Sequence, residues 1–392
     1  MNLDLHDTKS SAILTALTDG RRRSGSAALG MVLTLVIDVD ESIHYDALRA
    51  ANTAAREHPC RIVTVIRRAG KSAPRLDAEI RVGEENSLGE VIILRLYGLL
   101  RDQADSIVLP MLLPDAPVLV WWPGIGPAIP SQDKLGMLAQ RRVTDAAATS
   151  RPTASLRIRS QGHSPGDTDL AWTRITPWRT LLAAALDQPF DEIVSGEVSA
   201  AGGNASAELL AAWLECRLGV DVTRKVTRGP GITGVRLLTR RGEITITRPD
   251  GRLATLVRTG QPDRAVALPR RATDELLAEE LRRLDPDDVY NETIRRVFGS
   301  HATVGRKATT NRTKSADAAT PLTKRPSSAR KSVATKKAEG ADSPAAKRAP
   351  ASAARTRSVS SSTGTSSSKG KRTVAKKAIA TKTARKKAPA AK

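Results

Sequence analysis

The residues best suited to chemistry are concentrated in one short stretch, GDTDLAWTRITPWR at 166–179. It contains two of the five tryptophans of the chain, together with two aspartates and two arginines, although only 3% of all residues are aromatic. An arginine can pair with a carboxylate through charge-assisted hydrogen bonds, and its guanidinium can stack on an indole ring. Tryptophan and arginine are also enriched at the energetic centres of protein interfaces. Two interpretations stay open, a surface that binds a partner and a buried corner between domains.

A second aromatic pair lies in APVLVWWPG at 116–124, where an apolar run ends in two tryptophans. Successive side chains of a strand point to opposite faces. One of these two indoles is therefore expected in a core and the other near the surface. The candidate partner-binding residues are Asp167, Asp169, Trp172, Arg174, Trp178, Arg179, Trp121 and Trp122.

Two glycine-containing motifs resemble phosphate-binding loops, but their contexts argue against that function. GPGITG at 229–234 matches the dinucleotide pattern, yet the following VRLLTR predicts a strand where the pattern requires a helix. AGKS at 69–72 would place the first glycine of a P-loop at Val65, inside a strand. The histidines lack metal-binding spacing, and no nucleophile elbow is found in the sequence. We expect polar turns at both motifs, and we expect no catalytic residue, cofactor or metal.

The charge of the chain is concentrated at one end. The net charge is +22, but residues 301–392 contain 24 lysines and arginines against three acidic residues, so the rest of the chain is nearly neutral. This segment has no aromatic residue and is rich in Ala, Lys, Ser and Thr. It has too little apolar surface to offset the entropy of ordering. The sequence predicts a disordered basic tail over 301–392.

The N-terminal part alternates strand and helix patterns. This predicts an α/β domain with a mixed sheet over residues 1–150, because apolar strands interleaved with helices are typical of such layers. The expected helices cover 8–20, 42–57 and 98–109, and the expected strands cover 31–39, 60–67, 75–82, 90–97 and 116–122.

The following part predicts a second, α+β domain over residues 151–300. After a loop at 160–169, a helix is expected to begin with Thr176 as its N-cap, and another to run from Asn204 to Gly219. Arg-Gly and Asp-Gly turns at 220–268 predict antiparallel hairpins. Two helices close the domain, the second capped by Asp285.

Cellular location follows from what the sequence contains and lacks. The two cysteines, Cys60 and Cys216, form no close pair, as is usual in a reducing compartment. The start of the chain does not have the form of a signal peptide. The longest apolar run, 107–122, is interrupted by three prolines and an aspartate. A cytoplasmic protein without membrane association is expected.

Six blocks in consistent order resemble one family, the OpcA glucose-6-phosphate dehydrogenase assembly proteins. The blocks are ANTAAREHPCRIV, PRLDAEIRVG, EVIILRLYGLL, LPMLLPDAPVLVWWPG, GDTDLAWTRITPWRTLLAAALD and LRRLDPDDVY, within residues 1–298. The resemblance implies a non-catalytic partner that binds glucose-6-phosphate dehydrogenase, promotes its active oligomer and raises its activity. It supplies no catalytic residues, and the basic tail lies outside it.

Two other functions compete with this one. The Lys/Ala-rich tail is similar to that of linker histones, which favours a nucleic-acid-associated protein that binds without sequence preference. The nearly neutral body of the chain argues against nucleic-acid binding as the main function. An enzyme that acts on a sugar phosphate or nucleotide through an unfamiliar site is the third interpretation.

Overall fold

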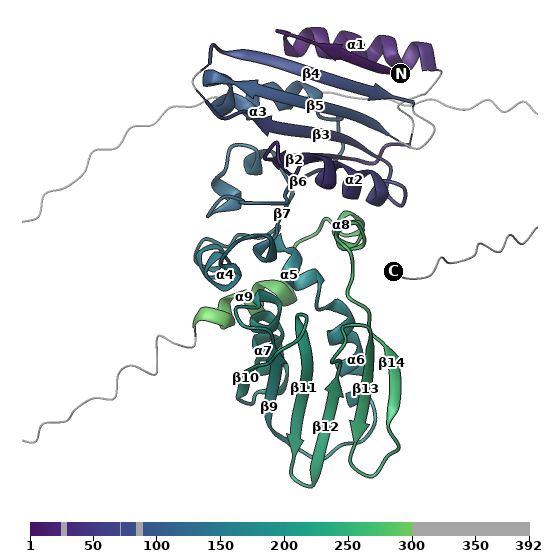
Figure 1. Cartoon of the computed structure of the whole chain (residues 1–392), viewed down its shortest axis with the longest axis vertical. Coiled ribbons are helices and arrows are strands. Elements are labelled where there is room, and N and C mark those ends of the chain that lie inside the picture. The colour runs from purple at the N-terminus through teal and green to yellow at the C-terminus, as the bar shows by residue number, and fades with distance from the viewer. Residues whose placement is uncertain (25–29, 71, 84–88, 300–392) are drawn as a thin grey trace, which may run out of the picture. The chain divides into compact units, whose positions relative to one another are not determined.

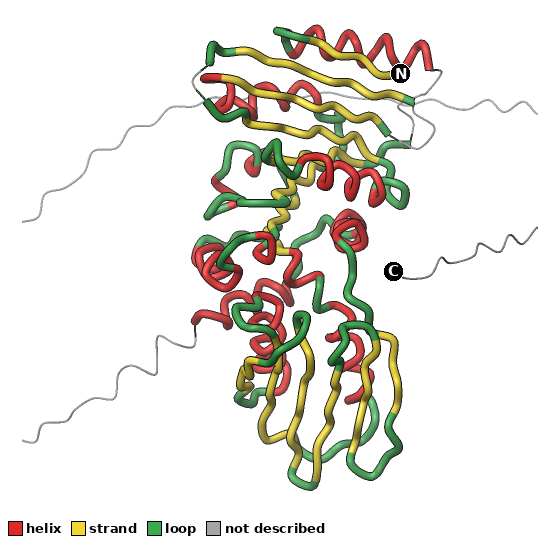
Figure 2. The backbone as a smooth tube through the Cα atoms, viewed as in Figure 1, coloured by secondary structure: helices red, strands yellow, loops and turns green. Residues whose placement is uncertain are grey.

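The computed structural model describes residues 1–24, 30–70, 72–83 and 89–299, which contain two sheets and the helices that cover them (Figures 1 and 2). The predicted basic tail lies outside the described residues. The α/β class with a mixed first sheet is confirmed. Among the described residues, no helix is long and apolar enough to cross a membrane.

The first sheet has eight strands in the order β1-β4-β5-β3-β2-β6-β7-β8. The six strands from β5 to β8 in this order are parallel, and β4 and β1 add antiparallel pairs at one edge. The strands are β1 (Asn2–Leu5), β2 (Leu33–Val39), β3 (Cys60–Arg67), β4 (Arg75–Val82), β5 (Glu90–Tyr97), β6 (Val118–Trp122), β7 (Arg141–Thr144) and β8 (Asp167–Asp169).

Helices cover both faces of this sheet, which explains why its central strands are apolar at almost every position. On one face, α2 (His44–Ala54) and α8 (Thr273–Arg282) pack on Leu35 and its neighbours. On the other face, α1 (Ser10–Ser24) and α3 (Ala104–Val108) pack on Val36 and its neighbours. Short 3-10 turns complete this half at Gly98–Gln103, Leu109–Met111, Pro130–Gln132, Gly136–Leu138 and Ala146–Ala148.

Trp121 and Trp122 point to opposite faces of β6, as expected. The expectation that one of them lies near the surface is wrong, because their exposed fractions are 1% and 2%. Both faces of the sheet are covered at β6, so each indole enters a different core. The indole N–H of Trp122 donates to Asp38 at 3.2 Å, and Asp38 is also paired with Arg67.

The second sheet has six strands in the order β10-β9-β11-β12-β13-β14. The predicted hairpins are confirmed for β11 to β14, while β10 pairs with β9 in parallel and β9 itself was not predicted. The strands are β9 (Ile193–Ala200), β10 (Val222–Val226), β11 (Ile232–Thr239), β12 (Gly242–Thr247), β13 (Leu253–Arg258) and β14 (Arg264–Ala267).

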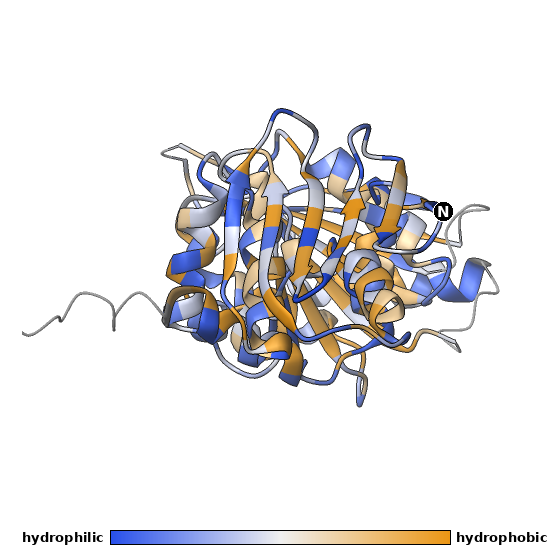
Figure 3. Cartoon of the chain, turned by 90° about the horizontal axis from the view of Figure 1, so that it is seen from below, coloured by the Kyte–Doolittle hydropathy of each residue, from blue (hydrophilic) through white to orange (hydrophobic). Residues whose placement is uncertain are grey.

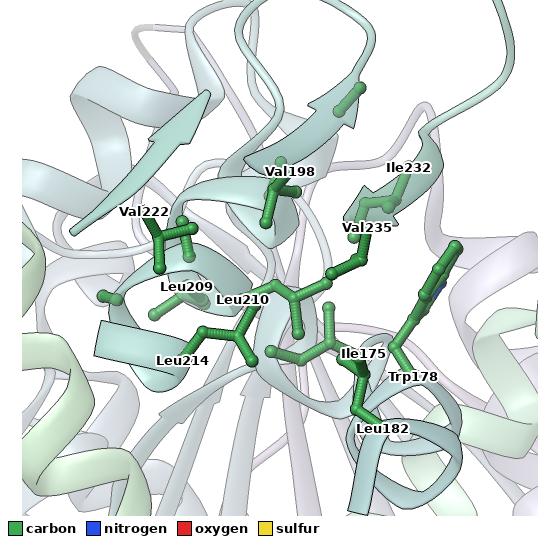
Figure 4. Packing of buried hydrophobic residues seen from close by; sticks show 14 of the residues in the cluster. Ile175, Trp178, Leu182, Val198, Leu209, Leu210, Leu214, Val222, Ile232 and Val235 are labelled. Carbon is green, nitrogen blue, oxygen red and sulfur yellow. The ribbon is translucent and has the colours of Figure 1, made fainter. Parts of the chain in front are cut away.

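One face of the second sheet forms a core with two helices, α6 (Thr176–Leu186) and α7 (Ala205–Leu218). Figure 4 shows Leu182 and Leu210 of these helices directed toward Val198 and Val235 of the sheet. Apolar and polar positions alternate along strands (Figure 3), as the period of two requires for a sheet with one buried face. Three further helices complete the fold, α4 (Pro152–Gln161), α5 (Leu170–Thr173) and α9 (Asp288–Gly299).

The predicted helix ends are correct for α7 and displaced for the other two helices. Asn204 caps α7 by accepting from the Ala207 amide at 3.0 Å, and Gly219 ends it with a left-handed φ of 68°. Thr176 is the first residue of α6 rather than its N-cap, and its hydroxyl donates to Glu279. Asp285 does not cap α9, because Asp287 accepts from the first-turn amide of Tyr290.

The domain boundary near residue 150 stays a prediction. Beyond it, β8 pairs with β7 in the first sheet, and α8 packs against α2. The described chain therefore passes from the first sheet to the second and then returns to the first.

The two cysteines are expected to differ in reactivity. Cys60 is fully buried, and this burial raises the pKa of its thiol to about 12, whereas Cys216 is partly exposed. The thiolate is the reactive form. At pH 8.5, an aromatic disulfide reagent should modify one thiol in the native protein and two in denaturant. Rapid modification of the one remaining thiol, that of Cys60, in the native Cys216→Ser variant would contradict this assignment.

Cys60 should also make stability depend on pH. Above about pH 8.5 the unfolded thiol ionises while the folded thiol stays neutral, so each further unit removes about 1.4 kcal/mol until the folded pKa is reached. The stability contributed is complete below the unfolded pKa and is lost as the pH rises. Comparison of denaturant unfolding of wild type and Cys60→Ala at pH 7.5 and 9.5 isolates this slope from other titrating groups.

Candidate functional site

The stretch predicted as a functional site lies where β8, α5 and α6 follow one another. β8 contains Asp167 and Asp169, α5 contains Trp172, and α6 contains Trp178 and Arg179. Both tryptophans are buried, with exposed fractions of 2% for Trp172 and 1% for Trp178. Their burial agrees with the interpretation of this stretch as a buried corner. Direct contact of these residues with a partner stays a prediction.

Asp169 organises the loop that joins the last two strands of the first sheet. Its carboxylate accepts from the amides of Ala146 and Ala171 at 3.0 and 2.9 Å and from the hydroxyl of Thr144 at 2.7 Å. Arg159 of α4 supplies a cation at 3.1 Å. Burial raises the pKa of Asp169, and the charge of Arg159 opposes this shift. One buried carboxylate thus holds the ends of β7 and β8 and the start of α5 in place.

Two further ion pairs flank Asp169. Arg142 of β7 pairs with Asp167 of β8 and also donates to the carbonyl of Ala139. Arg174, next to α5, makes a two-pronged contact with Asp145, with both distances 2.7 Å. Planar guanidinium groups match carboxylates in this bidentate geometry, which fixes orientation as well as distance. Each of these acids is at least nine-tenths buried.

Trp172 connects the cluster to the last helix. Its indole N–H donates to Asp287 at 2.8 Å, immediately before α9, and its ring lies 5.5 Å from that of Tyr290. The guanidinium of Arg179 lies 3.7 Å from the centre of the Trp172 ring. The guanidinium is therefore stacked on the indole, as the composition predicts. Burial lowers the pKa of Arg179.

Arg141 and Glu280 connect the first sheet to α8. Their carboxylate and guanidinium meet at 2.7 Å, and the two side chains are 4% and 5% exposed. Arg141 also donates to the carbonyl of Asp285, while the second oxygen of Glu280 accepts from Thr173. Since Glu280 lies 139 positions after Arg141, the sequence offered no local signal for this pair.

Sequence reasoning also missed an arginine-lined cavity beside the cluster. It has a volume of about 280 Å³ and lies next to Trp178, at the start of α7. Its arginines are Arg174, Arg248, Arg270 and Arg271. Only the first was a candidate, because the others are 70 or more positions away in sequence. The pair of arginines in LPRRATDELL was the one available signal.

The first sheet resembles nucleotide-binding sheets in strand order but not in its first turn. Its parallel strands follow the doubly wound order, with the change of direction between β2 and β6. A dinucleotide requires glycines in the first strand-to-helix turn, where the backbone approaches the pyrophosphate. Here that turn reads DESI at 40–43, with two acidic residues and no glycine.

Comparison with protein families gives two adjacent matches. Residues 51–161 match a family model described as the glucose-6-phosphate dehydrogenase subunit N-terminal domain. Residues 165–294 match one described as the C-terminal domain of the same subunit. A curated relative from a Synechocystis species, named putative OxPP cycle protein OpcA, is 28% identical over 189 residues. That alignment covers 43% of this chain and 39% of the relative, so the chain spans about two fifths of the relative's length.

Among solved structures, similarity is weak in sequence and in geometry. A 3-ketoreductase from Actinomadura kijaniata has 12% identity and a TM-score of 0.39, over 69% of this chain and 96% of that one. An oxidoreductase from Sinorhizobium meliloti has 11% identity and a TM-score of 0.40, over 69% of this chain and 95% of that one. A dehydrogenase from Clostridium difficile has 8% identity and a TM-score of 0.36, over 68% of this chain and 96% of that one.

The buried pair between Arg141 and Glu280 should be essential for stability. Glu280→Gln removes the negative charge and leaves Arg141 charged and buried, which should lower the free energy of unfolding by about 3–5 kcal/mol. The matched control is Glu57→Gln, because Glu57 pairs with Arg282 of the same helix while both side chains are more than half exposed. Its loss should be about 0–1 kcal/mol. Denaturant titrations measure both, and equal losses would refute the assignment.

Proposed function

The chain belongs to the OpcA family of glucose-6-phosphate dehydrogenase subunits, and we propose that it binds this dehydrogenase as a non-catalytic assembly factor and allosteric activator. The enzyme in question belongs to the oxidative pentose phosphate pathway. The observation that carries the proposal is the extent of the family match. The two matched ranges, 51–161 and 165–294, cover most of both sheets and the buried cluster between β7 and α9.

The internal chemistry supports a binding protein more than an enzyme. The most concentrated set of acids, arginines and tryptophans is used to hold segments together, since Asp169, Asp145 and Glu280 are each saturated by hydrogen bonds and cations. A general acid or base must reach a substrate proton, directly or through one water. Buried groups with filled hydrogen bonds serve position rather than proton transfer.

An activator of this kind has to distinguish between states of its partner. A ligand shifts an equilibrium only by its difference in affinity for the two states. We therefore infer that the chain binds the active oligomer of the dehydrogenase more tightly than the inactive form. The effect would saturate with added chain, and it would appear as a changed oligomer population or substrate affinity.

Of the eight residues predicted to bind a partner, only those with solvent-exposed atoms can touch it directly. Arg174 and Arg179 are only partly buried, whereas the four tryptophans and two aspartates are buried. We propose that any direct contact is made by these two arginines and that the other six residues act through the shape they maintain.

The nucleic-acid alternative rests on the charge of residues 301–392 alone. That segment has a net charge of +21 and would bind polyanions through counterion release, with a steep dependence on salt. It has no role in the proposed activation.

Activation without turnover is the first expected result. The purified chain should raise the activity of glucose-6-phosphate dehydrogenase in a saturable way and should not oxidise glucose 6-phosphate by itself. Enzyme assays over a titration, combined with analytical ultracentrifugation of the mixture, measure both effects. Intrinsic dehydrogenase or lactonase turnover by the chain alone would overturn the proposal.

The control for this experiment is a chain truncated after residue 300. It should activate the dehydrogenase as well as the full chain does, while losing its retention of DNA at about 50 mM salt. Loss of activation on truncation would assign the tail to the enzyme partner instead.

The tryptophan variants separate a binding role from a structural one. Trp172→Ala and Trp178→Ala should each lower the free energy of unfolding by about 3–5 kcal/mol, because each indole is at most 2% exposed. Chemical denaturation measures the loss, and dehydrogenase binding is then measured on the fraction that remains folded. A folded variant with normal stability and at least thirtyfold weaker binding would place the indole at the interface.

A further inference from the structure

The cavity beside Trp178 has an unbalanced electrostatic lining. Four arginines line it, and none of its described lining residues is acidic. The remaining lining consists of Trp178, Ile232, prolines, small residues and the start of α7. Since arginines repel one another, such a lining is stable only if neighbouring acids or a bound anion compensate the charge. Two of the four have an acid of their own outside the cavity, Asp145 for Arg174 and Glu279 for Arg271.

Arg248 has no such acid among the residues that the structure describes. It is 5% exposed and donates to the carbonyls of Leu268 and Ile232 at 2.9 and 3.0 Å. Its Nε is buried and without a hydrogen-bond partner, and its guanidinium lies over the ring of Trp178 at 4.9 Å. The two carbonyls and the indole ring carry no net negative charge, and the carboxylate of Asp250 acts on this guanidinium only through space, without an ion pair. This side chain is therefore positioned for an anion that the chain itself does not supply.

Arg270 adds a second uncompensated charge. It is exposed, and within the described ranges it makes no ion pair. Its backbone is fixed, because its amide donates to the carbonyl of Gly251 at 3.1 Å. An arginine on a fixed backbone at the mouth of a cavity can fold over a ligand without rearrangement of the sheet.

The start of α7 supplies backbone donors to the same cavity. The chain passes from β9 through Gly202 and Gly203 into a helix of 14 residues, and Ala205 and Ser206 of its first turn line the cavity. Gly203 has a φ of 68°, a left-handed backbone conformation that favours glycine. Because glycines have no side chain, Gly202 and Gly203 leave the space in front of this turn free. First-turn amides and the helix dipole both favour an anion at such a position.

We propose that this cavity binds the phosphate group of a small phosphorylated metabolite, held by Arg248 and Arg270 at the N-terminus of α7. The two uncompensated charges match a phosphate dianion better than a single carboxylate. The volume of about 280 Å³ accommodates a phosphate with a few attached carbons and excludes a polymer or a peptide chain. The inference goes beyond the proposed function, since the ligand binds this chain without the dehydrogenase.

The test measures phosphate binding to the full chain by calorimetry in about 0.2 M sodium chloride, which suppresses binding by the basic tail. The probes are inorganic phosphate and glycerol 3-phosphate. We expect one saturable site per chain in wild type. Arg270→Gln should weaken binding at least tenfold while leaving the melting temperature without ligand unchanged, because its side chain makes no ion pair in the described ranges.

Two further variants make the result specific. Arg248→Met should abolish binding, and circular dichroism shows whether it folds. Arg217→Gln is the matched control, because it removes the same charge from the last turn of α7, at the opposite end of the helix from the cavity. Its phosphate affinity should equal that of wild type.

Three outcomes would overturn the proposal. The first is the absence of saturable binding in wild type, and the second is equal weakening by Arg217→Gln and Arg270→Gln, which would indicate a general charge effect. The third is unchanged phosphate binding in Arg270→Gln together with loss of dehydrogenase binding, which would make the cavity mouth a docking point for an acidic side chain. The first two outcomes are measured on the chain alone and do not depend on whether it binds or activates the dehydrogenase.

Discussion

The burial of one carboxylate, that of Asp169, constrains the connection between the two sheets. A carboxylate at 1% exposure is tolerated only where its oxygens are hydrogen-bonded and a cation is close. Thr144, Ala146, Arg159 and Ala171 meet that demand from four different segments. The strand end, the loop, α4 and the start of α5 must therefore all be in place together. Asp145 and Arg174, and through them one wall of the arginine cavity, are positioned by the same arrangement.

The strands and helices that could be predicted from sequence are those whose own hydrophobic pattern matches the way the folded protein buries them. β3, β4 and β5 have the predicted bounds, because β3 and β5 are largely apolar runs and β4 alternates apolar with charged residues. β9 was missed because IVSGEVSA contains a glycine and alternates small polar residues with apolar ones. Its strand structure comes from pairing with β10 and β11 rather than from its own composition.

The candidate site shows a different limit. Tryptophan beside arginine and aspartate is the composition of interface centres and also of buried corners, so the residues of 166–179 alone could not separate the two. The deciding contacts come from Asp287 and Glu280, which lie more than 100 positions away. The arginine cavity was not predicted for the same reason, since Arg174, Arg248 and Arg270 are brought together only by the folded chain. The first sheet likewise keeps a nucleotide-binding strand order while its DESI turn departs from the motif, so fold and site carry separate information.

The return of the chain through α8 has a consequence for synthesis on the ribosome. The apolar face of α2 packs against α8, which begins about 220 residues after α2 ends. At a synthesis rate of about 5–20 residues per second, roughly 10–45 seconds pass between the synthesis of α2 and that of α8. During that interval the first sheet can form its strand pairs but presents one bare apolar surface. The nascent chain is thus most prone to aggregation in the interval before α8 emerges, and a chaperone that shields this surface until then would raise the yield of folded protein.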